Sequence, residues 1–155
     1  MTLYSFDTSS FLNGIRDLLP PSVLPTLWTN VEDMIRDGSI CSVDLVKDEL
    51  KKRDDETLRW VKAQPKLFVP LEQDVQAAVG EVLRRHPRLI GVGSGRSGAD
   101  PFVVALAHAR NGVVVTEETA TGNIERPRIP DVCRAMGIPH MNLIGFVKAQ
   151  GWVFR

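Results

Sequence analysis

The fold of this chain is decided by the stretch 113-VVVTEE-118. Its first four residues are β-branched without a break, which is typical of a strand buried on both faces of a parallel sheet. Apolar runs at residues 3–6 (LYSF) and 39–41 (SIC) predict two further strands, with helix-like apolar spacing between them. Strands that alternate with helices predict an α/β fold, a three-layer α/β/α sandwich around a mainly parallel central sheet.

Local signals predict the helix starts and the remaining strands. The expected helix-capping residues are short polar side chains that precede apolar helical runs, namely Ser9 or Ser10, Ser22, Asp100 and Asp131. Residues 67–69 (LFV) predict a further strand, and residues 152–154 (WVF) are expected to finish a last pair of elements, one helix and one strand.

Composition and length narrow the class of protein. A chain of 155 residues with 43% hydrophobic and 25% charged residues predicts one compact domain over residues 1–155 and excludes a disordered, collagenous or coiled-coil chain. Two cysteines, Cys41 and Cys133, are too few for a disulfide framework, so we expect buried thiols in a reducing compartment. The N-terminus has no positive region of a signal peptide, and no apolar run reaches the length of a bilayer. We therefore expect a cytoplasmic protein without a membrane partner.

The charges of the chain balance as a whole but not along its length. Lys and Arg number 19, as do Asp and Glu, and this balance argues against a general binder of polyanions. Residues 1–83 hold 14 acidic and 9 basic side chains, whereas residues 84–155 hold 5 acidic and 10 basic ones. This split predicts an acidic site beside a basic rim.

Carboxylates recur at the carboxyl ends of the predicted strands. Asp7 follows the first strand, Glu117 and Glu118 follow the valine strand, and Asp100 and Asp131 stand at helix starts. In an open parallel sheet these positions share one edge, where ligands bind. A capping role would account for Asp100 and Asp131 taken singly. Asp7 needs another explanation, because a charge at the end of a buried strand requires a partner.

A fifth carboxylate comes from a predicted helix. Val43, Val46 and Leu50 define its buried stripe, and Asp48 lies almost opposite to them. Glu49 lies at the margin of the stripe, from where its side chain can reach the sheet edge. We expect Glu49 to be the acidic residue that this helix contributes to the site.

Gathered carboxylates point to a divalent cation. Anions at one point raise each other's pKa unless a cation neutralises them. Hard oxygen ligands suit Mg²⁺ or Mn²⁺, which also bind phosphates and activate water. Metal-assisted phosphodiester hydrolysis is therefore the reaction class that these residues favour.

Four segments resemble the signature of the PIN domain family, in the same order and at a similar spacing: residues 4–10 (YSFDTSS), 46–50 (VKDEL), 99–102 (ADPF) and 114–118 (VVTEE). The resemblance extends over nearly the whole chain. Residues 128–133 (RIPDVC) also resemble a PIN-like subfamily of uncharacterised bacterial proteins.

The resemblance implies a PIN-like ribonuclease that binds Mg²⁺ or Mn²⁺. The catalytic and metal-binding acids of the family would fall on Asp7, Glu49, Asp100 and Glu118, with Ser9 hydrogen-bonded near the first. Glu118 stands where the family has aspartate, so Glu117 is a second choice, and Asp131 either adds a ligand or only caps its helix. Many bacterial members are toxins of type II toxin–antitoxin pairs. The implied partners are thus an RNA substrate, a small antitoxin protein and, as a homodimer, a second copy.

Two alternatives remain open. Gly93, Gly95 and Gly98 form a G-x-G-x-x-G pattern after the strand-like residues 89–90, with Glu117 19 positions after Gly98, which would suit a dinucleotide-binding module. However, Asp100 would place a negative charge where the pyrophosphate should lie. The other alternative is a catalytically silent PIN-fold protein that acts by binding alone, and the presence of all four acids argues against it.

Basic residues surround the glycine-rich loop. As a group they are candidates for contacts with RNA phosphates, which supply most of the nonspecific affinity for nucleic acid. The foremost candidates are Arg96, Arg126 and Arg128, preceded along the chain by Arg84, Arg85, His86 and Arg88.

Overall fold

A parallel sheet forms the centre of the computed structural model, which describes residues 1–53, 55–90 and 98–155. Within these residues the sheet has the order β2-β1-β3-β4. Its strands are β1 (Tyr4–Phe6), β2 (Ile40–Cys41), β3 (Val113–Val115) and β4 (His140–Met141). Every neighbouring pair is parallel. The predicted α/β fold with a parallel sheet is confirmed.

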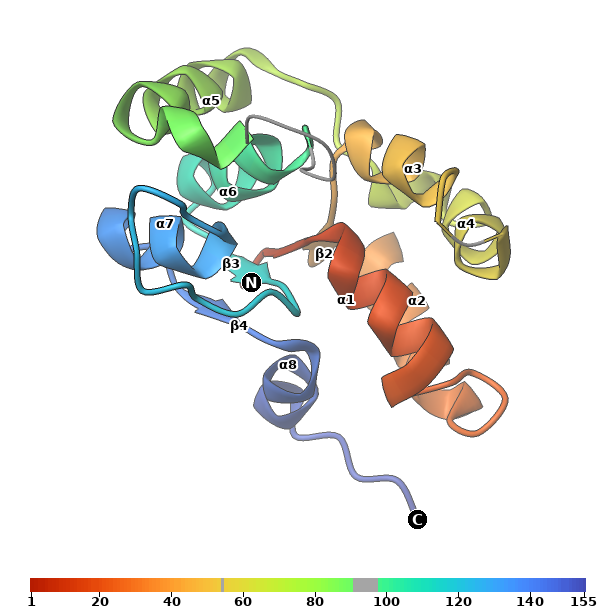
Figure 1. The fold of residues 1–155 in the computed structure, drawn as a ribbon. Helices are drawn as coiled ribbons and strands as arrows, with labels where there is room; N and C mark the ends of the chain where they lie inside the picture. The colour runs from red at the N-terminus through yellow and green to blue at the C-terminus, as the bar shows by residue number, and fades with distance from the viewer. Residues whose placement is uncertain (54, 91–97) are drawn as a thin grey trace.

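Helices cover both faces of this sheet (Figure 1). The α-helices are α1 (Thr8–Asn13), α2 (Pro25–Arg36), α3 (Asp44–Leu50), α4 (Asp55–Lys62), α5 (Gln73–Arg85), α6 (Asp100–Ala109), α7 (Ile129–Met136) and α8 (Leu143–Gln150). A π-helical segment, η1 (Gly14–Leu18), extends α1, and two short 3₁₀ turns are η2 (Pro65–Leu67) and η3 (Pro87–Ile90). None of the helices in the described ranges is long and apolar enough to span a bilayer.

The alternation of side chains along β1 creates the two packed layers. The Phe6 ring lies 5.3 Å from that of Phe11 on α1 and 5.1 Å from that of Phe146 on α8. On the opposite face, the Ser5 hydroxyl donates a 2.8 Å hydrogen bond to the Val103 carbonyl of α6. One strand therefore joins both layers of the core.

The register of the sheet places the ends of β1 and β3 side by side. Phe6 pairs with Val115, and the backbone N–H of Asp7 donates to the Val115 carbonyl at 3.0 Å. Asp7 and Thr116, the next residues of the two strands, consequently lie at the same carboxyl edge.

Two predicted strands are wrong. Residues 67–69 contribute one isolated bridge, between Phe68 and Ser42. A longer strand does not form there, because Leu67 still belongs to the 3₁₀ turn η2. Residues 152–154 make aromatic contacts in place of a strand: the ring of Trp152 lies 5.8 Å from that of Phe146. The last strand is β4, which precedes α8.

The predicted caps are also corrected. Asp7, not Ser9 or Ser10, caps α1, and α2 begins at Pro25, beyond Ser22. Helices α6 and α7 begin near Asp100 and Asp131, but their N-cap residues are Ala99 and Arg128; Asp131 still takes part in the capping of α7, because its carboxylate accepts the N–H of Arg128. Asp100 is the first residue of α6, and Asp131 is the third residue of α7.

Candidate functional site

Asp7 is the buried centre of the predicted acidic site. Only 2% of its surface is exposed, and the strand end holds it in place. Oδ1 accepts a 2.8 Å hydrogen bond from the Thr8 N–H, and Oδ2 accepts bonds from the hydroxyls of Ser9 (2.8 Å) and Thr116 (2.9 Å). Burial raises the pKa of Asp7, although these hydrogen bonds oppose the rise. A cation would stabilise the charged form of such a carboxylate.

Glu49 lies beside Asp7, as its place on the helix predicts. Its Oε2 accepts a 2.5 Å hydrogen bond from the hydroxyl of Thr8, and its Oε1 accepts a 3.2 Å bond from the N–H of Ala99. Burial is the main cause that raises the pKa of Glu49, and the neighbouring charge of Asp7 adds to it. Asp48, on the same helix, is exposed.

Asp100 brings a third acid to this edge. It directly follows Ala99, whose N–H binds Glu49, and it is 2% exposed at the start of α6. The carboxyl end of β1, helix α3 and the N-terminus of α6 therefore meet at the same edge, and each carries one buried or half-buried acidic residue.

The two glutamates after β3 bind the starts of the next two helices. Glu117 Oε1 accepts a 2.7 Å hydrogen bond from the N–H of Leu143, the first residue of α8. Glu118 Oε1 accepts a 3.1 Å bond from the N–H of Ile129, the first residue of α7. A negative side chain at a helix N-terminus is favourable. Both carboxylates therefore have a structural role here.

A buried thiol lies near two of the predicted ligands. Burial raises the pKa of Cys133 to about 12, and the charges of Asp7 and Glu118 add to this effect. Asp7 and Glu118 therefore both lie close enough to Cys133 to raise the pKa of its thiol.

Asp131 organises the loop that precedes α7. Its Oδ2 accepts hydrogen bonds from the N–H of Arg128 (2.9 Å) and from the N–H and hydroxyl of Thr121 (3.0 and 3.1 Å). Its Oδ1 accepts a 3.0 Å bond from the N–H of Gly122. Burial alone would raise the pKa of Asp131, but these bonds together lower it. This pattern favours the structural alternative for Asp131 over a role as metal ligand.

The acidic residues suit a divalent ion by their chemistry more than by their present positions. Asp7, Glu49 and Asp100 are oxygen donors, and burial disfavours the charge of the first two. Among residues 1–53, 55–90 and 98–155, however, no three Asp, Glu, His or Cys side chains are arranged to hold a metal. Glu49 and Glu118 are instead held by backbone N–H groups, which an ion would have to displace.

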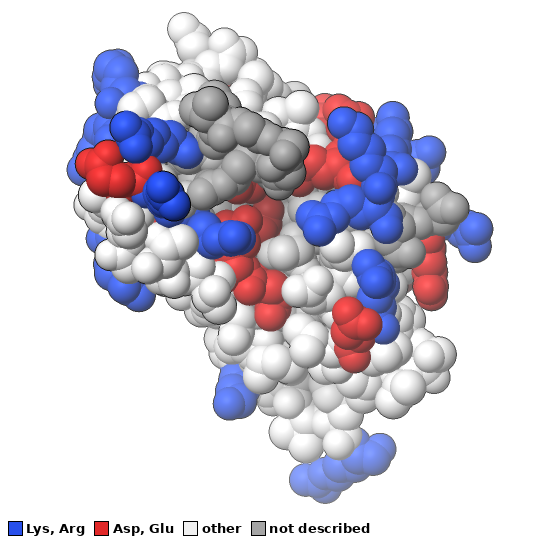
Figure 2. Space-filling model, in the orientation of Figure 1, with Lys and Arg blue, Asp and Glu red and all other residues white. Residues whose placement is uncertain are grey.

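Basic residues lie on both sides of the acidic edge. Figure 2 shows acidic side chains gathered along the middle of one face, with basic side chains to the left and right of them. Arg126 and Arg128, two of the predicted phosphate contacts, are exposed, whereas Arg96 lies outside the described residues. Acidic and basic side chains therefore adjoin one another on this face of the molecule.

The dinucleotide-binding alternative loses its structural context. Gly93 and Gly95 lie outside the described residues, but residues 89–90, which were expected to be strand-like, belong to the 3₁₀ turn η3. Helix α6 also begins with the negative charge of Asp100.

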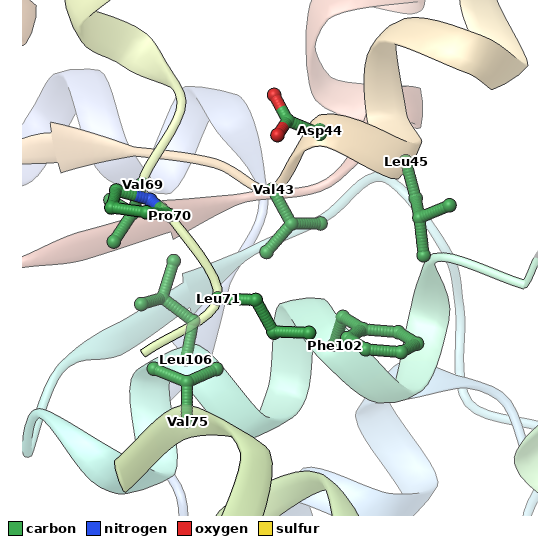
Figure 3. A pocket seen from close by; sticks show the side chains of 9 residues that line it. All are labelled: Val43, Asp44, Leu45, Val69, Pro70, Leu71, Val75, Phe102 and Leu106. Carbon is green, nitrogen blue, oxygen red and sulfur yellow. The ribbon is translucent and has the colours of Figure 1, made fainter. Parts of the chain in front are cut away.

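An apolar cavity lies apart from the acidic edge, and none of the predicted site acids lines it. It has a volume of about 170 Å³ and lies between α3, residues 69–71 and helices α5 and α6 (Figure 3). Eight of its nine lining residues are Val, Leu, Phe or Pro, and Asp44 is the charged one. It therefore lacks the converging polar groups of a catalytic site.

Sequence reasoning missed two residues that orient the acids, Thr8 and Thr116. The Thr8 hydroxyl binds Glu49, and the Thr116 hydroxyl binds Asp7. Each directly adjoins a strand end, and this position is the signal that could have identified both.

Comparisons with known proteins identify the family of the chain and its fold. The family model described as "Domain of unknown function (DUF4411)" matches residues 4–154. The chain belongs to the DUF4411 family. No curated protein sequence matches this DUF4411 chain significantly.

Two solved structures of other proteins have a fold similar to that of the DUF4411 chain. VapBC2 from Rickettsia felis, bound to a DNA fragment from their promoter, is similar with a TM-score of 0.54 at 17% identity, over 91% of this chain and 98% of that one. FitAcB from Neisseria gonorrhoeae is similar with a TM-score of 0.53 at 15% identity, over 92% and 99% of the two chains. The predicted PIN-like fold is thereby confirmed.

Proposed function

We propose that the DUF4411 chain is an Mg²⁺- or Mn²⁺-dependent endoribonuclease that acts as the toxin of a type II toxin–antitoxin pair. The observation that supports this most is that Asp7 and Glu49 lie together at the carboxyl edge of the sheet. Both are among the acids that the resemblance to the PIN family implies. Ligand sites of open parallel sheets lie at this edge.

In this proposal the acids hold the ion. Asp7, Glu49 and Asp100 are the ligands, with Glu118 as a fourth and Glu117 as the second choice for that place. The bound ion supplies an activated water and neutralises charge on the phosphodiester. Because burial raises the pKa of Asp7 and Glu49, the same ion also stabilises their ionised forms.

The remaining residues of the site position these acids. The hydroxyls of Ser9 and Thr116 hold Oδ2 of Asp7, and each of them in turn accepts an N–H from the turn after β3 (2.9 Å from Glu117 and 3.1 Å from Glu118). Asp7 is thus fixed in one orientation. To hold an ion, Glu49 would have to give up its bonds to Thr8 and Ala99, and Glu118 would have to give up its bond to Ile129.

The substrate is RNA, held by its phosphates. Arg126 and Arg128 are exposed on the loop after Glu118 and supply charge for this contact, with Arg96 as a further candidate. Because the whole chain has zero formal charge, this local rim must provide the attraction.

The toxin role follows from the resemblance to the PIN family. It implies a small antitoxin that inhibits the enzyme in the cytoplasm, and a second copy of the chain as a further partner. The similar VapBC2 structure is bound to promoter DNA, so a small DNA-binding protein encoded next to this chain would support the proposal.

Cleavage by purified full-length protein tests the activity. Single-stranded RNA is incubated with the protein and Mn²⁺, with Asp7→Asn as the matched variant and a chelator as the second control. If both the Asp7→Asn substitution and the chelator abolish cleavage, the result supports a metal-dependent ribonuclease. Equal cleavage by the variant would indicate a contaminating nuclease, and RNA binding without cleavage would favour the silent alternative.

A further inference from the structure

A second pocket lies on the basic part of the chain, next to the loop that begins at the acidic edge. Arg85, His86, Pro87 and Arg88 line it from one side, and Ile124 and Glu125 line it from the loop. Its volume is about 220 Å³, below the roughly 300 Å³ at which pockets for whole small molecules begin. The pocket therefore suits one unit of a longer ligand.

The two arginines of this pocket are weakly engaged. Arg85 lies 3.6 Å from Glu81, and Arg88 lies 3.4 Å from Glu125, with side chains 48% and 63% exposed. Arg88 also donates a 3.3 Å hydrogen bond to the carbonyl of Glu125. Exposed ion pairs of this kind contribute little stability, so both guanidinium groups can turn to a phosphate at small cost.

His86 adds a side chain whose chemistry suits a sugar hydroxyl. Its Nε2 is buried and has no hydrogen-bond partner among the residues that the structure describes. Burial, helped by the charge of Arg85, lowers the pKa of His86, which favours the neutral ring. A neutral imidazole nitrogen can exchange a hydrogen bond with a hydroxyl, and a ribose 2′-hydroxyl is both donor and acceptor.

The loop connects this pocket to the acidic edge. The loop runs from Glu118 to Ile129, and its two ends lie together because the Glu118 carboxylate accepts a hydrogen bond from the N–H of Ile129. Ile124 is six residues from Glu118, so the two Cα atoms lie at most about 21 Å apart. A single RNA strand can therefore reach both places.

We propose that this pocket holds one phosphate and ribose unit of the RNA strand, with Arg85 and Arg88 on the phosphate and His86 Nε2 on the 2′-hydroxyl. The proposal rests on the RNA substrate of the proposed function and adds a subsite that distinguishes RNA from DNA. Ile124, 48% exposed, and Pro87 supply the apolar wall beside it.

Binding measurements on the full chain test this subsite. The Asp7→Asn variant, with chelator present, is titrated with a short fluorescent single-stranded RNA and with DNA of the same sequence over a series of salt concentrations. Adding Arg88→Ala should make the slope of log K against log salt shallower by about 0.7, the effect of one lost phosphate contact on a single strand. Arg36→Ala, which removes an exposed arginine on α2 paired with Asp33, is the matched control and should keep the slope.

Adding His86→Phe tests the sugar contact. It should weaken RNA binding by about two- to tenfold, the equivalent of one hydrogen bond, and leave DNA binding unchanged. An unchanged slope in Arg88→Ala, an equal loss for RNA and DNA in His86→Phe, or no RNA binding by the parent would each overturn the subsite. Cleavage by the unmodified chain decides the proposed function separately. Thermal unfolding confirms that each variant is folded.

Discussion

Thr116→Val tests how the fold maintains the buried charge of Asp7. Valine has nearly the shape of threonine but lacks the hydroxyl that donates to Asp7 at 2.9 Å and accepts from the N–H of Glu118 at 3.1 Å. A hydrogen bond to a charged group contributes about 1.5–3 kcal/mol, and one between neutral groups about 0.5–1.5 kcal/mol. Because both are lost, we expect the free energy of unfolding to fall by about 2–4 kcal/mol at neutral pH.

The loss should depend on pH with a definite sign. The folded pKa of Asp7 is raised by burial, and Thr116 is one of the groups that restrain it. The variant raises this pKa further, so its extra cost applies where Asp7 is ionised and shrinks as Asp7 becomes protonated. Well below the ordinary carboxyl pKa, where Asp7 is protonated in both the folded and the unfolded state, only neutral hydrogen bonds are lost, and the expected cost falls to about 1–2 kcal/mol.

Urea unfolding at about pH 7.5 and about pH 2.5 measures both values. Thr29→Val is the matched control, because the hydroxyl of Thr29 is exposed and binds only the Pro25 carbonyl of its own helix. It should change stability by less than about 0.5 kcal/mol. A cost for Thr116→Val that is the same at both pH values, or no larger than that of Thr29→Val, would refute the reasoning.

Three further predictions concern Asp7, Asp131 and the two cysteines. Asp7→Asn should be more stable than the parent at neutral pH, and the difference should vanish as the pH falls below the ordinary carboxyl pKa; a variant that is less stable at neutral pH would contradict the raised pKa. Asp131→Ala should lower the free energy of unfolding by about 2–4 kcal/mol through the lost bonds to Thr121, Gly122 and Arg128, yet retain Mn²⁺ binding, measured by urea unfolding and calorimetry. Cys41 and Cys133 are buried, and burial raises the pKa of both thiols, so a thiol reagent near pH 8 should label neither before unfolding; rapid labelling of the folded chain would show that they are accessible.

The sequence predicted the parts of the fold that depend on apolar periodicity. The three strands that contain β1, β2 and β3 are confirmed, because buried β-branched and aromatic runs have few other places to pack. The strand predictions for residues 67–69 and 152–154 were wrong, because a short apolar run does not show which residues it packs against. Phe68 makes a single bridge to Ser42, and Trp152 packs on an aromatic ring.

The acidic edge was predictable in position but not in detail. The helical phase of Glu49 and the place of Asp7 follow from sequence, since periodicity and strand ends determine where these side chains begin. Their hydrogen-bond partners do not follow from it. That Glu117 and Glu118 would bind the starts of α8 and α7 depends on where those helices pack, which is a tertiary property.

Calorimetric titration with Mn²⁺ tests most directly whether the buried acids form a metal site. Full-length protein and Asp7→Asn are compared under the same conditions, with unfolding curves to show that both are folded. The parent is expected to bind Mn²⁺ and the variant to bind at least about tenfold more weakly, because a ligand is lost. Equal affinity in the two proteins, or no binding by the parent, would contradict a metal site at the carboxyl end of β1.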